Sequence, residues 1–263
     1  MRSIDLHSKT NGDNEMKSLA DKLKKNQTLV TLHLSSNEIG DIGMEYLSYG
    51  IQTNRVIRAF VLSNNRIGDI GVQHLANALQ NNTTITDVNL SGNDIGNIGA
   101  QYLSAVLQNN TTIAMLDLSN NQIDDIGAHQ LYDSLKKNKF FFTQMWNRLV
   151  LCCNKFGDNE IKLLAEVLHN NKTVTELNLS GNEIGDQGVQ YLCDVLRNNT
   201  TVTKLDLLDN RIGDRGVQCL ADALRTNTTL VTLVLNDPLN KKNQISDSAA
   251  QYLADALQTN RVL

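Results

Sequence analysis

Little in the sequence is arranged as a catalytic or metal site, although the chain holds five histidines and four cysteines. Cys152 and Cys153 are adjacent and cannot easily bridge each other, and no C-x-x-C pair, zinc-ligand spacing or phosphate-cradling glycine loop occurs. Asp5 and His33 fall in the same column of two neighbouring predicted strands, where a cross-strand polar pair is more typical than an acid–base pair. No serine or cysteine is placed beside a histidine with an orienting carboxylate. We therefore predict that the protein is not an enzyme and has no catalytic residue, cofactor or metal ion.

Composition restricts the class of protein further. The 263-residue chain is 41% hydrophobic and 20% charged, as expected for a soluble folded protein. Its formal net charge of −4 and pI of about 5.7 argue against nucleic-acid binding, which needs a basic surface. No apolar run approaches the roughly 18 residues of a membrane span, and the start of the chain carries no signal region. With the cysteines expected to be reduced, we predict a cytoplasmic, monomeric protein that does not bind membranes.

The elements that must position any functional residue come from an internal repeat. The asparagine of an L-x-L-x-x-N segment recurs every 28 residues at Asn37, Asn65, Asn93 and Asn121, and again at Asn154, Asn182 and Asn210. The steps to Asn154 and Asn243 are 33 residues, so five-residue insertions are expected near 139–145 and 238–242. The repeated cores predict nine strand-turn-helix units in a single domain spanning residues 1–263. Both ends look cut rather than capped, so the chain is interpreted as a fragment of a longer protein, with the alternative that Lys9 and neighbouring polar groups serve as a modest cap.

Residues 173–199 show how one unit is expected to fold. Leu177 and Leu179 alternate with polar residues, the period-2 pattern of a half-buried strand. Asn182 lies where the chain turns, and its amide is expected to bond neighbouring units in an internal ladder. Asp186 is a suitable N-cap for the helix that follows, and Asn199 is expected to close that helix in the left-handed conformation. The N-x-T sequons that recur at this last position are therefore interpreted as helix-end turns rather than glycosylation sites.

The pattern L-x-x-L-x-L-S-x-N-x-I-G-D-x-G-x-x-x-L-A-x-A-L resembles the ribonuclease-inhibitor-like class of leucine-rich repeats. That class also forms the sensor ends of NOD-like receptors, and similar arrays occur in effectors that intracellular bacteria inject into host cells. The resemblance covers nearly the whole chain and implies an α/β leucine-rich-repeat solenoid. Parallel strands lie about 4.8 Å apart and packed helices about 8–10 Å apart, so such a stack curves into a horseshoe with strands on the concave face and helices on the convex face.

The concave face is where such solenoids usually bind partners. Four positions of each repeat are expected to be exposed on this face: the residue before the two core apolar residues of the strand, the residue between them, and the two residues that follow. At these positions there are seven acidic residues and two basic ones, Arg148 and Lys204. This bias favours a protein partner with a basic face, although strand faces that only contact solvent are the alternative. The strand residues that we predict to bind the partner are Asp87, Asn89, Met115, Asp117, Arg148, Val150, Glu176, Asn178, Lys204 and Asp206.

The first insertion adds an aromatic cluster, Phe140, Phe141 and Phe142. Three phenylalanines cannot all enter the core from a five-residue bulge, so we assign them to partner binding, with local packing as the alternative. The second insertion, with Lys241 and Lys242, is interpreted as a surface loop at the rim.

The leading functional hypothesis is a protein-binding scaffold. By the resemblance, it would inhibit or regulate a partner enzyme sterically, and it would act in the host cytosol if it were an injected effector. The alternatives are the ligand-sensing repeat end of a NOD-like receptor and a GTPase activator of the Ran-activating kind. The activator would need a catalytic residue on the loops, where Arg66 and Arg211 hold matching positions.

Overall fold

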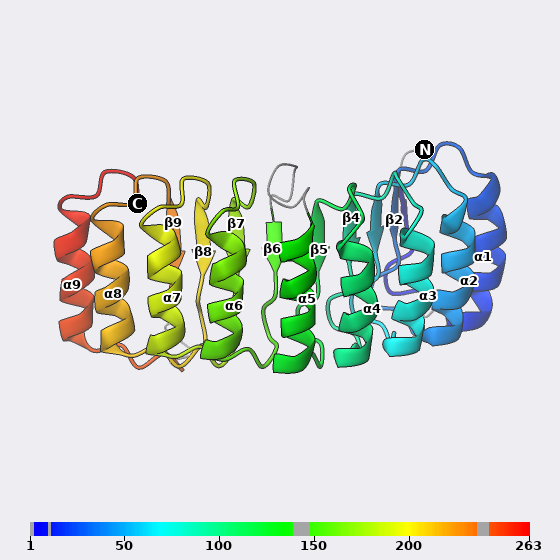
Figure 1. The fold of residues 1–263 in the computed structure, drawn as a ribbon. Helices are drawn as coiled ribbons and strands as arrows, with labels where there is room; N and C mark the ends of the chain where they lie inside the picture. The colour runs from blue at the N-terminus through cyan, green and yellow to red at the C-terminus, as the bar shows by residue number, and fades with distance from the viewer. Residues whose placement is uncertain (1–2, 10–11, 139–147, 236–241) are drawn as a thin grey trace. The chain divides into compact units, whose positions relative to one another are not determined.

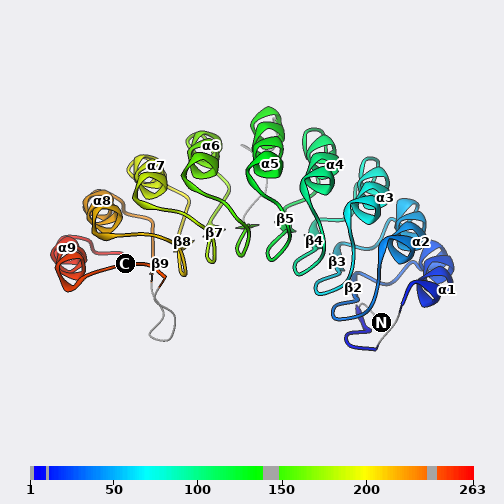
Figure 2. The same ribbon diagram turned by 90° about the horizontal axis from the view of Figure 1, so that it is seen from below.

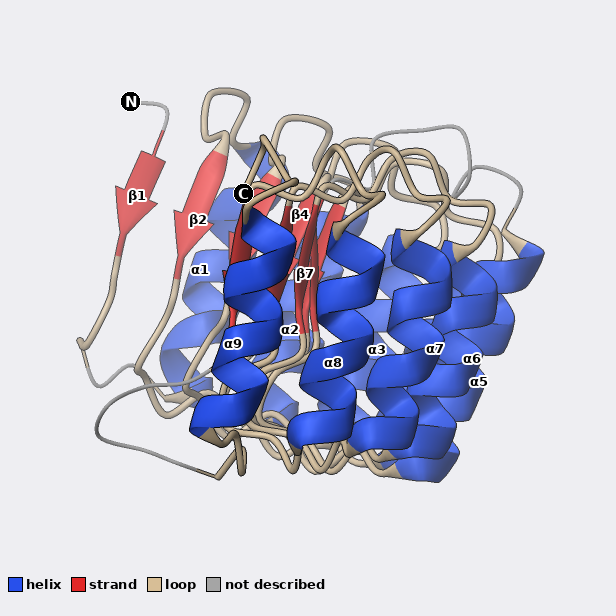
Figure 3. Cartoon of the chain, turned by 90° about the vertical axis from the view of Figure 1, so that its left-hand side faces the viewer, coloured by secondary structure: helices blue, strands red, loops and turns tan. Residues whose placement is uncertain are grey.

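The computed structural model describes residues 3–9, 12–138, 148–235 and 242–263. The chain divides into two compact units, Met1–Phe140 and Phe141–Leu263, and each is described here by itself. In both units every repeat is a short strand followed by a helix, as Figures 1 and 3 show.

Unit 1 alternates five strands with five helices in its described part. The elements are β1 (Ser3–Asp5), α1 (Asp13–Lys25), β2 (Thr31–His33), α2 (Asp41–Gln52), β3 (Ala59–Val61), α3 (Asp69–Leu79), β4 (Asp87–Asn89), α4 (Asn97–Leu107), β5 (Met115–Asp117) and α5 (Asp125–Lys137). Each strand pairs in parallel with the next at equal register, so that Leu32 lies opposite both Ile4 and Phe60.

Unit 2 repeats this arrangement. Its described elements are β6 (Arg148–Val150), α6 (Asp158–Leu168), β7 (Glu176–Asn178), α7 (Asp186–Leu196), β8 (Lys204–Asp206), α8 (Asp214–Leu224), β9 (Thr232–Val234) and α9 (Asp247–Leu257). Its strands are also parallel and in register, as in the pairing of Leu177 with Leu205. In each unit the strands form one face and the helices the other, and the strands lie closer together than the helices (Figure 2). The predicted α/β repeat of parallel strands and helices is therefore confirmed.

The core of each unit lies between these two faces. In β2 to β5, β7 and β8 the middle strand residue and the residue just after the strand are buried, as Leu32 and Leu34 illustrate with 0% exposure. From the helices, apolar residues at spacings of three and four enter the same layer, as Val189, Leu192 and Leu196 do in α7. The period-2 strand pattern and the helical pattern thus meet in one apolar layer.

The predicted asparagine ladder is confirmed. The Nδ2 of Asn93 donates to the carbonyls of Leu62, one repeat back, and Leu90 in its own repeat, both at 3.0 Å. Its Oδ1 accepts from the Ile67 amide at 3.1 Å. This side chain is buried and satisfies backbone groups of two repeats at once, which an apolar residue could not do. Asn37, Asn65, Asn182 and Asn210 do the same.

The prediction that Asp186 caps its own helix is wrong. The N-cap of α7 is Gly185, and the Asp186 Oδ1 accepts from Gly213 N at 2.7 Å, at the N-cap of α8, and from Gly216 N at 2.9 Å, in the first turn of α8. The aspartate therefore caps the helix of the following repeat. The carboxylate can approach this closely because residue 216 is a glycine. A Cβ at Gly216 would lie only 2.7 Å from the carboxylate oxygen and would clash with it.

The helix ends also differ from the prediction. Among the described residues positive φ occurs just after the strands, for example at Asn64, Gly92 and Cys153, and not at Asn199. The Oδ1 of Asn199 accepts from the amides of Thr201 and Val202, which makes a side-chain turn instead of a left-handed cap. The interpretation of the N-x-T asparagines as turns is confirmed, since all six accept from the amides two and three residues later: Asn26, Asn82, Asn110, Asn171, Asn199 and Asn227. All of them except Asn26 are buried.

Candidate protein-binding surface

The candidate surface is the strand face, which we define as the first and third residue of every strand. Because side chains alternate along a strand, these two columns point away from the helices. Val150 is the exception to their exposure: we predicted it to be exposed, but it is 5% exposed. It is a short side chain between Arg148, Glu176 and Asn178, with which it lines a cavity of only about 20 Å³. That volume admits little more than one water, so this part of the face has no small-molecule site.

The strand face of unit 1 is acidic. Asp5, Asp87 and Asp117 project from it, and its two columns contain no lysine or arginine among the described residues. The Oδ2 of Asp87 accepts from the Thr86 hydroxyl at 2.5 Å, which fixes the carboxylate in place. Met115 is partly exposed beside it in the next strand, opposite Asp87 in the register.

Several predicted binding residues have a structural task that the sequence reasoning missed. The Oδ1 of Asn89 accepts from the backbone amide and the hydroxyl of Ser91, at 2.9 and 2.7 Å. Asp117 does the same with Ser119, at 3.0 and 2.6 Å. Asn178 and Asp206 close equivalent turns in unit 2. The signal was in the sequence, because an Asn or Asp stands two residues before the turn in each case.

The strand face of unit 2 has equal numbers of acidic and basic residues, Glu176 and Asp206 against Arg148 and Lys204, and a further ion pair, Lys242 with Asp209, lies outside it. Arg148 Nε lies 3.3 Å from Glu176 Oε2 across neighbouring strands. Lys242, at the end of the second insertion, places its Nζ 2.8 Å from Asp209 Oδ2. Lys204 is exposed on the strand between them. The acidic excess expected over the whole face is thus concentrated in unit 1.

Two groups of predicted residues fall elsewhere. Phe140, Phe141 and Phe142 lie outside the described residues, as does the second insertion up to Lys241. Asp5 and His33 lie opposite each other in the register, but Asp5 Oδ1 accepts from the amide of His7 at 2.9 Å.

The described residues add no catalytic or metal-binding arrangement. No group of three or more histidine, cysteine or carboxylate side chains gathers as a metal site within them. Burial, together with the neighbouring Cys219 thiol, raises the pKa of the Cys193 thiol, so this cysteine stays protonated and a poor nucleophile. None of the helices described is long and apolar enough to cross a bilayer.

The repeat geometry agrees with the family comparisons. A family model described as "Leucine Rich repeat" matches residues 25–48, 53–76, 81–104 and 109–129. A second, "TMOD/LMOD Leucine-rich domain", matches residues 153–263. The chain is a leucine-rich-repeat protein. The matches cover repeats in both units and stop short of assigning the ribonuclease-inhibitor-like class.

The chain also matches solved structures. Among them is a chain titled "Leiomodin-1 Actin-Binding Site 2 (ABS2)", which is 17% identical. The similarity covers 52% of this chain and 80% of that one, with a TM-score of 0.46. No curated protein sequence matches the chain. Leucine-rich-repeat domains are generally scaffolds for binding other proteins, and the repeats of this chain support a role of that kind.

Proposed function

We propose that this leucine-rich-repeat protein binds another protein through its strand faces and regulates it sterically. The observation that carries the proposal is the acidic strand face of unit 1. Asp87 and Asp117 lie on adjacent strands there, and the described part of the two columns contains no lysine or arginine that would neutralise them. Such a surface favours a partner with a basic patch, because complementary charge raises the association rate and disfavours other partners.

The finer proposal is inhibition of an enzyme whose active-site cleft is basic. A scaffold that covers such a cleft blocks substrate without any chemistry of its own, which fits a face where the carboxylates and amides also hold turns. Asn89 and Asp117 are pinned by their serine partners and lose little conformational freedom on binding. The proposal also places this inhibition in the cytosol, which is the cytosol of the host cell if the protein is an injected effector.

The experiment removes charge from the strand face without removing the turns. Asp87→Asn, Asp117→Asn and Asp206→Asn are combined, because asparagine already closes the equivalent turns at Asn89 and Asn178. Proteins are captured from lysates on the wild type and the variant at low and high salt. We expect a partner with a basic face to be retained by the wild type, to bind the variant at least about tenfold more weakly, and to lose salt sensitivity.

The matched control removes three carboxylates from the helix face of unit 2. Asp194→Asn, Asp222→Asn and Asp255→Asn change the net charge equally, at exposed positions on α7, α8 and α9. If this control weakens capture as much as the strand-face variant does, net charge and not the strand face determines binding, and the proposal fails.

A further inference from the structure

Four helices of unit 1 expose an isoleucine at the same position, the second residue of the helix. Ile42, Ile70, Ile98 and Ile126 are 57%, 60%, 57% and 59% exposed. Their helices α2 to α5 follow one another side by side (Figure 2), so these side chains form a line that we call the isoleucine row.

The fold does not require isoleucine at this position. The Asp or Asn before the isoleucine accepts from amides at the start of the next helix in α2, α3 and α4, and the glycine after the isoleucine leaves room for the side chain that caps its own helix from the preceding repeat. The isoleucine between them faces solvent. In the other five described helices this residue is polar: Asn14, Asn159, Gln187, Arg215 and Ser248. Exposure of four apolar side chains to water at regular intervals is unfavourable unless another molecule covers them. Such patches usually mark interaction sites.

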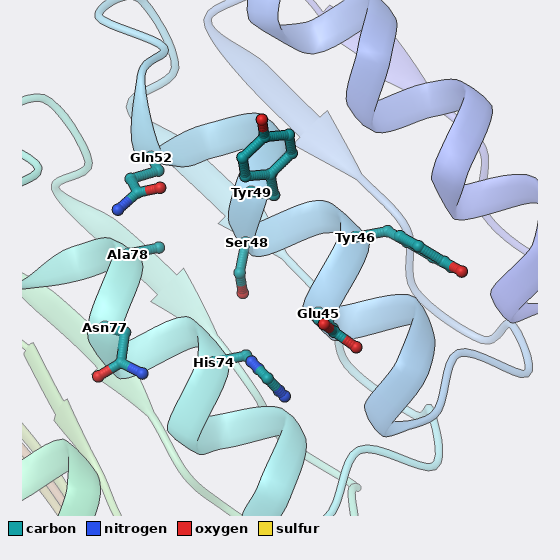
Figure 4. Close-up of a pocket in the computed structure, with 8 residues that line it drawn as sticks. All are labelled: Glu45, Tyr46, Ser48, Tyr49, Gln52, His74, Asn77 and Ala78. Atoms are coloured by element: carbon teal, nitrogen blue, oxygen red, sulfur yellow. The ribbon is translucent and has the colours of Figure 1, made fainter.

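A groove lies between α2 and α3, two of the helices that carry the row (Figure 4). It encloses about 390 Å³ and is lined by Glu45, Tyr46, Ser48, Tyr49 and His74 among others. Glu45 comes three residues after Ile42 and His74 four after Ile70, so both lie one turn further along the same helix faces.

The groove contains a buried hydroxyl with no hydrogen-bond partner among the described residues. This hydroxyl is the Ser48 Oγ, and the residue is only 5% exposed. The equivalent serine of α4, Ser104, donates to the Ala100 carbonyl at 2.8 Å instead. An unsatisfied polar group that lines a groove is a ready anchor for a polar atom of a ligand.

The border of the row is acidic. Within four residues of the four isoleucines there are seven carboxylates and a single arginine, Arg66, which is itself 3.5 Å from Glu38. The carboxylates are Glu38, Asp41, Glu45, Asp69, Asp94, Asp124 and Asp125. Two copies of the chain meeting here would bring like charges together, and an anionic membrane would be repelled by the same groups.

We propose that the isoleucine row and the α2–α3 groove form a second docking surface, for a protein segment that combines apolar side chains with net positive charge. Apolar side chains of that segment cover the isoleucines, and a basic side chain enters the groove beside Glu45. Four helices packed about 8–10 Å apart span a distance that a helix of about 20 residues covers. This surface lies on the helix side of unit 1 and is separate from the strand face.

The test uses a phage-displayed random peptide library, about 20 residues per peptide, panned on the whole chain. The variant replaces all four row isoleucines with glutamine, the residue that unit 2 carries at Gln187. The control is Val231→Gln, which removes an apolar side chain that is 55% exposed in unit 2. We expect enriched peptides to be basic with spaced apolar residues, and to bind the isoleucine variant at least about tenfold more weakly while binding the control unchanged.

A second pair of variants tests the charge. Glu45→Lys should weaken the selected peptides several-fold, whereas Gln190→Lys, at the equivalent place on α7, should not. Enrichment of acidic or uncharged peptides, or equal binding by the isoleucine variant, overturns the proposal. So does a dimer in sedimentation that the isoleucine variant abolishes, or binding to phosphatidylserine vesicles that depends on the row.

Discussion

At the residue scale, the asparagine ladder shows what a sequence can predict. Asn93 recurs in register with the other ladder residues, and a polar side chain repeated among buried leucines must have a constant partner. The ladder bonds confirm this reasoning. Val150 shows the limit, because its burial depends on the neighbouring Arg148 and Glu176 side chains and not on its place in the repeat.

Removing one ladder side chain should destabilise the protein strongly. In Asn93→Ala the Leu62 and Leu90 carbonyls and the Ile67 amide lose their side-chain partner. Since buried backbone groups left unsatisfied cost about 1–3 kcal/mol each, we expect the free energy of unfolding to fall by about 2–4 kcal/mol in urea denaturation. Asn77→Ala, at an exposed position on α3, should change it by less than about 0.5 kcal/mol, and an equal effect of the two would contradict the ladder's role.

At the element scale, the helices show how neighbouring repeats depend on each other. An aspartate at a helix start predicts a cap for that helix, and the sequence alone cannot reveal that the amides it reaches lie 27 and 30 residues later. The same cross-repeat cap joins α1 to α2, α2 to α3 and α3 to α4. The helices and their spacing followed from the repeat, but the direction of the cap required the packed structure.

Asp186→Ala should therefore loosen α8 and not α7. The first-turn amides of Gly213 and Gly216 lose their acceptor, and we expect a loss of about 1 kcal/mol in unfolding free energy. Hydrogen–deuterium exchange should increase at the start of α8 and stay unchanged at the start of α7. Gln187→Ala, one residue further on, serves as the control, and faster exchange confined to α7 would show that the aspartate caps its own helix.

The start of α9 gives a pH-dependent version of this contact. Ser246 donates its hydroxyl and its amide to the Asp214 carboxylate, at 2.6 and 2.8 Å, and these bonds lower the pKa of Asp214. A lowered folded-state pKa means that the contact stabilises above the unfolded-state pKa and is lost as pH falls through the folded-state value. In Ser246→Ala, NMR titration should show the Asp214 pKa rising toward its usual value. No rise would mean that the hydroxyl does not hold the carboxylate.

At the scale of the whole molecule, the repeat period predicted the order and kind of every described element. It could not predict which part of a face carries unpaired charge, because the pairs Arg148–Glu176 and Lys242–Asp209 depend on side-chain contacts between repeats. The pairing of Lys242 also joins residues 33 positions apart across the second insertion. The positions of the repeat therefore predict which residues are candidates for the surface, but they do not predict which of its charges are paired.

Because each repeat contacts its neighbours, a whole repeat should be removable. Deleting residues 82–109 takes out β4 and α4 and joins Asn81 to Asn110, which is equivalent to Asn82. We expect a folded protein whose urea m-value is lower by roughly one tenth, in proportion to the surface lost. A deletion of residues 82–95 breaks the register and should not fold, as circular dichroism would show. If both deletions fold equally well, the repeat is not the unit of folding.

The two polar systems that join the repeats point in opposite directions along the chain. Each cap reaches forward, from Asp41 to the start of α3, whereas the ladder reaches back, from Asn93 to the carbonyl of Leu62. A molecule pulled from its ends would therefore yield by different routes. Peeling away a repeat on the N-terminal side strips the next helix of its cap, and peeling on the C-terminal side strips the previous strand of its amide partner. In α1 and α6 a glutamate of the same helix also accepts from the amide of the N-cap residue: Glu15 from Gly12 at 3.0 Å and Glu160 from Gly157 at 2.7 Å. These two helix starts therefore have a cap from their own repeat.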